Sequence, residues 1–180
     1  MAKKEKKLGY EVLGEKDRPE LYKLLKQLFE KHHRERLGKT RIVLAVSRKW
    51  KPNADGLLQL DKCKKAGELE RQLHGYDFAI VLNENLLAHE GDFTAKQLAA
   101  VLDHELCHCA VREDADGNPK KDAKERTIYR VRKHTIEEFH EIVERHGCYK
   151  SDVDRFFRAL LEREKTPLLE GAKEAKTGTA

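Results

Sequence analysis

Two short runs rich in β-branched residues lie among segments of helical periodicity, and this order constrains the fold more than any other feature of the sequence. The runs are RIVLAV at residues 41–46 and DFAIVL at residues 77–82, and both have the length and composition of buried strands. Ahead of them, four leucines at spacings of three and four predict a helix over 18–37. Because the strands precede most of the helical segments, we predict an α+β fold with a small, mostly antiparallel sheet.

A second long helix is predicted from Thr94 to Val111. Thr94 can cap the helix, and Gln97 three residues later completes a capping box. Shorter elements are expected on both sides of this helix: strands at 57–60 and 127–131, a loop at 113–122, and helices at 135–146, closed by Gly147, and at 151–164.

The 180 residues suit one domain, which we place at 17–165. A flexible basic N-terminus at 1–16 is expected before it, and a disordered tail at 166–180 after it. No stretch approaches the roughly 20 apolar residues of a membrane span, and no apolar segment follows the N-terminal lysines. We therefore expect a cytoplasmic protein with no membrane partner.

Charge and cysteine content bear on partners and on the redox state. The 37 Lys and Arg exceed the 32 Asp and Glu by 5, and the basic excess is concentrated at 2–7 and 120–133. Such runs are usually solvated faces, but they keep nucleic acid open as an alternative partner. The four cysteines form no CxxC pair, so we expect thiols rather than a zinc ribbon or a redox motif.

The pentapeptide HELCH, from His104 to His108, lies inside the predicted helix 94–111. Residues four apart share one face of a helix, so the two imidazoles can bind a single zinc ion from successive turns. Glu105 lies about 100° further around the helix and can reach a zinc-bound water without becoming a ligand. It would accept the proton of that water and later donate it to the leaving amine. The motif therefore predicts Zn²⁺ as cofactor and Glu105 as the catalytic residue.

A catalytic zinc needs a third protein ligand beside an open position. We predict His134 for this role. Thr135 and Glu138 form a capping-box pattern, which would place His134 where the helix 135–146 begins. Glu138 is the main alternative, since some zinc peptidases take a glutamate from a second helix.

Other polar residues near the motif are candidates for supporting roles. Asp103 precedes the first histidine and either supports that ligand or lies in solvent. An oxyanion stabiliser is also expected, and Tyr129, Arg130 and Arg132 are candidates that the spacing does not separate.

Two strings in this chain resemble the metallopeptidases encoded in bacteriophage and prophage genomes. They are LDHELCHC at 102–109 and RKHTIEEFHEIVERHG at 132–147, and the strand DFAIVLN before them fits the same pattern. A more distant resemblance is to SprT-like zinc proteases, although this chain lacks the cysteine-rich zinc ribbon of many of them. The resemblance implies a zincin-like fold, with zinc ligands at His104, His108 and His134 and an acid/base at Glu105.

The leading hypothesis is thus a zinc-dependent metallopeptidase that hydrolyses peptide bonds in a protein or peptide substrate. Zincins commonly hold an extended substrate against a sheet edge, and the strand at 77–83 is our candidate for that edge. One alternative is a non-enzymatic, zinc-stabilised phage protein that binds nucleic acid or protein. Another is a zinc amidase that acts on a non-peptide amide.

Overall fold

The computed structural model describes residues 9–54, 56, 58–87 and 94–164. The chain divides into two compact units, one ending at Lys133 and the other beginning at His134, and each is described by itself. The expectation of one domain over 17–165 stays a prediction, and the expected tail at 166–180 lies outside the described residues. Among the described residues, no helix combines the length and the apolar character that crossing a membrane requires.

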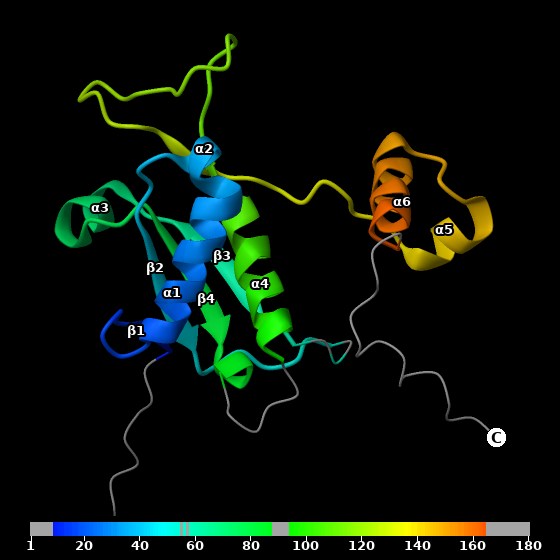
Figure 1. Cartoon of the computed structure of the whole chain (residues 1–180), viewed down its shortest axis with the longest axis horizontal. Coiled ribbons are helices and arrows are strands. Elements are labelled where there is room, and N and C mark those ends of the chain that lie inside the picture. Colours follow the sequence, from blue (N-terminus) through cyan, green and yellow to red (C-terminus); the bar gives the residue numbers. More distant parts are fainter. Residues whose placement is uncertain (1–8, 55, 57, 88–93, 165–180) are drawn as a thin grey trace, which may run out of the picture. The chain divides into compact units, whose positions relative to one another are not determined.

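The first unit is built on a four-stranded mixed sheet in the order β1-β2-β4-β3 (Figure 1). The central strands β2 and β4 are parallel, and each outer strand is antiparallel to its neighbour. The α+β class is therefore confirmed, with one parallel pairing inside the sheet. The strands are β1 Tyr10–Leu13, β2 Ile42–Ser47, β3 Asp61–Lys65 and β4 Phe78–Asn83.

Three expectations about these strands need correction. β4 was our candidate for the substrate-binding edge, but it pairs with β2 on one side and β3 on the other. The strand expected at 57–60 forms instead at 61–65, where pairing with β4 decides the register. Residues 10–13, inside the segment expected to be flexible, form β1 because β2 offers them an unpaired edge.

Two helical segments cover one face of this sheet (Figure 1). The predicted helix 18–37 forms, but as three successive pieces with a π-helical turn in the middle. Apolar side chains from these helices and from the sheet share one buried cluster, which fixes the helices on the sheet: Leu21, Leu25, Leu44, Ile80, Leu102 and Leu106. The helices are α1 Pro19–Leu28, the π-helical η1 Phe29–His33, α2 Arg34–Leu37 and α4 Ala95–His108.

The helix α4 begins as predicted and ends earlier than predicted. Thr94 Oγ1 accepts a hydrogen bond from the backbone of Gln97, and Gln97 Oε1 accepts one from the backbone of Thr94, so the capping box is confirmed. The helix stops at His108 because Cys109 takes an extended conformation and begins the strand β5, Cys109–Val111. β5 pairs with β6, Tyr129–Val131, in a second antiparallel sheet. The predicted helix therefore loses residues 109–111, because their pairing with the distant strand β6 outweighs the local helical pattern.

A ribbon at 112–128 connects β5 to β6 and contains two tight turns. Asp114 Oδ1 accepts hydrogen bonds from the backbone of Asp116 and Asn118, and Gly117 takes the positive φ of 83° that the turn requires. Asp122 closes the second turn in the same way. The expectation of a loop at 113–122 is thus confirmed. A short helix at Glu68–His74, α3, was not predicted.

The second unit contains the helices α5, His140–His146, and α6, Ser151–Glu164. Gly147 closes α5 with φ 65°, as predicted, but α5 begins at His140 rather than at residue 135. The expected capping box does not form, because the carboxylate of Glu138 binds Tyr149 and Lys150 instead. Residues 132–139 are therefore non-helical.

Candidate metal centre

The last turns of α4 bring two imidazoles to a separation that suits a shared ion. The Nε2 atoms of His104 and His108 lie 3.2 Å apart, and their rings cross at 82°. Two nitrogens that each bind a tetrahedral zinc at about 2.0–2.1 Å would lie roughly 3.3–3.4 Å apart. The i, i+4 spacing therefore has the geometry that the motif predicts.

A backbone carbonyl orients the ring of His108. Its Nδ1–H donates a hydrogen bond to Arg132 O over 2.6 Å. A proton on Nδ1 leaves Nε2 as the nitrogen with a lone pair, which is the form that binds a metal. The backbone N–H of Arg132 also donates to His108 O, over 2.8 Å. The backbone of Arg132, which directly follows β6, thus sets the tautomer of His108.

The ring of His134 joins these two. One nitrogen from each of His104, His108 and His134 can be chosen so that all three lie within 4.8 Å of one another. The sequence predicted this set of residues but not how it is assembled. His134 lies in a non-helical segment two residues after Arg132, not at the beginning of a helix. The ligand role of each histidine stays a prediction.

The alternative third ligand, Glu138, is engaged elsewhere. Its carboxylate accepts hydrogen bonds from the side chains of Lys150 and Tyr149, and from the backbone of Phe139. These partners, Lys150 first, lower the pKa of Glu138 to about 2. Glu138 is not a member of the histidine group. It acts within the second unit as the anchor of the turn at 149–150.

Glu105 is buried next to the histidines, with 2% of its surface exposed. Burial raises its pKa to about 8, and the charge and hydrogen bond of the neighbouring Asp61 carboxyl raise it further in the same direction. Its Oε1 lies 3.9 Å from His104 Nε2, while Oε2 is buried without a hydrogen-bond partner among the described residues. An orphaned buried oxygen calls for a partner outside the chain.

The donor set fits zinc. Neutral imidazole nitrogens are typical zinc ligands, and within the described residues the group has three members, which leaves one tetrahedral position for water or substrate. A water in that position would also give Glu105 Oε2 the partner that it lacks. The residues present therefore suit a catalytic zinc better than a closed structural one.

Arg36 and His33, which sequence reasoning missed, hold α4 from the side of the first helical segment. Arg36 donates to the carbonyl of Leu106, which also accepts from the backbone N–H of Cys109, and to the carbonyl of Cys109, which begins β5. It also donates to His33 Nδ1 over 2.9 Å, so His33 Nε2–H donates to Asp103 Oδ1 over 2.6 Å. Asp103 therefore ties α4 to the π-helical turn. These contacts join residues about 70 positions apart, so no local sequence pattern could have indicated them.

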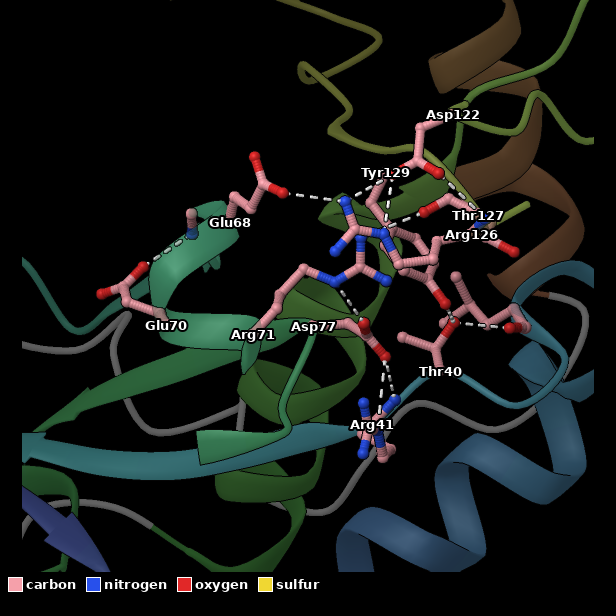
Figure 2. A network of polar contacts seen from close by, with 12 residues as sticks. Thr40, Arg41, Glu68, Glu70, Arg71, Asp77, Asp122, Arg126, Thr127 and Tyr129 are labelled. Atoms are coloured by element: carbon pink, nitrogen blue, oxygen red, sulfur yellow. Dashed lines mark hydrogen bonds and ion pairs between the residues drawn. The ribbon is translucent and has the colours of Figure 1, made fainter. Parts of the chain in front are cut away.

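Tyr129 is not suited to stabilise an oxyanion at this centre. Its ring is buried against Phe78, at 5.3 Å between centroids, and the guanidinium of Arg71 lies over it. Figure 2 shows Arg71 reaching from α3 to Asp77, with 3.0 Å between Arg71 Nε and Asp77 Oδ1. Arg126 beside it joins Asp122 to Glu68. This network fixes the base of the ribbon 112–128 to the main sheet.

Comparison with known proteins identifies a family. The family model described as "Putative phage metallopeptidase" matches residues 15–161, a range that includes both histidine-containing motifs. Neither the search of curated proteins nor the search of solved structures found a match.

Proposed function

The chain belongs to the putative phage metallopeptidase family, and from that premise we propose that it is a zinc-dependent peptidase. His104, His108 and His134 would hold the ion, and Glu105 would be the catalytic acid/base. The observation that carries this proposal is the convergence of three imidazole nitrogens within 4.8 Å, beside a buried carboxyl oxygen that has no partner among the described residues.

A bound zinc would polarise the scissile carbonyl and acidify a water. Glu105 supplies the proton transfer that hydrolysis needs. Its Oε2 takes a proton as the water attacks and returns it to the leaving nitrogen, so Glu105 ends the cycle in its starting state. Burial keeps bulk water from competing for this oxygen. A dication nearby would counteract the raised pKa of Glu105, because positive charge favours the carboxylate.

The edge strand β3 is the surface that we propose for the peptide backbone. β3 pairs with β4 on one side only. Cys63 on β3 places its Sγ 3.6 Å from Cys109 Sγ, and Cys109 directly follows His108. The strand therefore runs past the end of α4 that carries the motif. An extended substrate can add to such an edge through backbone hydrogen bonds.

Glu105→Gln tests the mechanism. The variant is expected to bind one zinc per chain and to lose peptide hydrolysis by a factor of about 10² to 10⁴. Zinc content by atomic spectroscopy and cleavage of a denatured protein substrate measure the two properties separately. Unchanged hydrolysis by the variant would exclude Glu105 as the acid/base. If the wild-type protein cleaves other amides but no peptides, the result would favour an amidase.

A matched pair of variants tests the third ligand. His134→Ala is expected to weaken zinc binding strongly and to abolish hydrolysis, because only two ligands would remain. Glu138→Gln keeps the size of the side chain and is expected to leave zinc affinity unchanged. If Glu138→Gln weakens zinc binding and His134→Ala does not, Glu138 rather than His134 is the third ligand. Zinc affinity is measured by competition with a chromogenic chelator.

A further inference from the structure

The arginines of the first unit differ in their partners, and Arg36 is already engaged with the carbonyls of Leu106 and Cys109 and with His33. Six of them form ion pairs with carboxylates of the described chain: Arg18, Arg34, Arg41, Arg48, Arg71 and Arg126. Among the described residues, no carboxylate lies within ion-pair distance of Arg112, Arg130 or Arg132. All three of these belong to the β5–β6 ribbon or follow it directly.

The alternation of β6 determines where these side chains point. Tyr129 faces the core, so Arg130 points away from it and is exposed. Arg112 lies beside Ile128 across the ribbon, with its N–H bound to Ile128 O, and is also exposed. Arg132 follows on the same side as Arg130, and its backbone binds His108 twice. The unpaired cations therefore form a row that ends at the metal-binding turn.

The edge strand β3 adds positive charge. Lys62, Lys64 and Lys65 are exposed there, and the one acidic residue of the strand, Asp61, is hydrogen-bonded to Glu105. Lys62 and Lys64 alternate with Asp61 and Cys63, so they lie on the other face of the sheet, where Lys64 lies over the ring of Tyr10. Lys65, on the face that Asp61 and Cys63 share, therefore adds one cation beside the proposed substrate-binding edge.

We propose that the site selects peptides that carry acidic side chains near the scissile bond, with Arg130 and Arg132 as the specificity-determining residues. This inference rests on the proposed peptidase function. Unpaired guanidinium groups recognise carboxylates through charge-assisted hydrogen bonds. A row of them beside a strand edge positions an extended acidic segment, whose backbone β3 can bind.

A peptide fits this surface better than a nucleic acid does. The first turn of the ribbon 112–128 exposes Glu113, Asp114 and Asp116 close to Arg112, so a continuous phosphate backbone could not follow the arginines without meeting these carboxylates. An unpaired strand edge offers backbone N–H and C=O groups in the register of a peptide. Acidic side chains spaced along a peptide can meet the arginines without meeting these carboxylates.

Binding to an inactive protein tests the inference without requiring turnover. Full-length, zinc-loaded Glu105→Gln protein is titrated into three fluorescent peptides of equal length, in which alternate positions are Glu, Gln or Lys. The Glu peptide is expected to bind about tenfold more tightly than the Gln peptide, a difference of about 1.4 kcal/mol, and to lose this advantage in higher salt. Equal binding of the Glu and Gln peptides would overturn the proposal.

A charge-matched pair of double variants locates the effect. Arg130→Gln with Arg132→Gln removes two positive charges from the row, and Arg18→Gln with Arg48→Gln removes two elsewhere. The first pair is expected to abolish the preference for Glu, and the second to preserve it. The backbone hydrogen bonds of Arg132 to His108 do not involve its guanidinium, so zinc content should stay unchanged in both. If both double variants lose the preference for the Glu peptide equally, the preference reflects overall charge and not Arg130 and Arg132.

Two further measurements separate the remaining outcomes. If a single-stranded oligonucleotide binds through Arg130 and Arg132 more tightly than the Glu peptide, the surface is a nucleic-acid site and the proposal is wrong. The wild-type protein is then given a mixed peptide library. Cleavage with no acidic preference would keep the peptidase function and reject this inference, whereas arginine-dependent binding without any cleavage would reject the peptidase function and leave only a binding surface for acidic peptides.

Discussion

Replacing Glu105 by Gln is expected to stabilise the metal-free protein, and only above the pKa of an exposed glutamate. The pKa of Glu105 is raised from 4.5 to about 8, mainly by burial. Below pH 4.5 the carboxyl is protonated in both folded and unfolded chains, so its titration contributes nothing to stability. Between pH 4.5 and 8 the unfolded chain loses the proton while the folded one keeps it, and the free energy of unfolding decreases with pH.

The size of the effect follows from that interval. Each pH unit within it lowers the free energy of unfolding by about 1.4 kcal/mol, so the cumulative loss at neutral pH is about 3 kcal/mol. Above pH 8 the loss stays constant. Gln has nearly the same shape, does not titrate, and can donate to the carboxyl of Asp61. The variant should therefore match the wild type near pH 4.5 and be more stable at neutral pH.

Urea unfolding in the presence of EDTA measures this difference across the pH range. The only tryptophan, Trp50, lies in the same compact unit as Glu105, so its fluorescence reports the unfolding of that unit. Glu113→Gln, at an exposed glutamate, is the control and should show no such trend. A stability gain that does not change with pH, or a wild type that is the more stable at neutral pH, would refute the reasoning. With zinc bound the gain should shrink, because the ion favours the carboxylate.

Three further substitutions test the supports of α4 and the chemistry of the thiols. Thr94→Ala removes the confirmed N-cap and should lower the free energy of unfolding by about 1 kcal/mol, measured by the same urea titration. Arg36→Ala removes a donor from the carbonyls of Leu106 and Cys109 and from His33, and should cost about 2 kcal/mol and weaken zinc binding; an unchanged zinc affinity would limit Arg36 to a stabilising role. Cys148 is exposed and Cys63 buried, so a thiol reagent should label Cys148 rapidly in the native protein, and Cys148→Ser should abolish that fast phase. Fast labelling that persists in Cys148→Ser would contradict the burial of Cys63 and Cys109 and the partial burial of Cys107.

Local sequence patterns predicted those parts of the fold that depend on neighbouring residues. The capping box of Thr94 and Gln97 and the closing glycine of α5 are local features, and both form. The strands at 42–47 and 78–83 formed because their apolar character suits burial on both faces. Local patterns failed where a segment pairs with a strand far away in the sequence. The helix α4 ends at His108 because the next three residues pair with β6.

The candidate site divides in the same way. The sequence by itself determined that His104 and His108 share a face, because a spacing of four is a property of any helix. Only the tertiary structure decided the rest. Pairing of β5 with β6 returns the chain to the end of α4, so Arg132 meets His108 and His134 follows two residues later. Asp61 reaches Glu105 from β3, a contact without any local signature, because long-range strand pairing rather than sequence spacing brings them together.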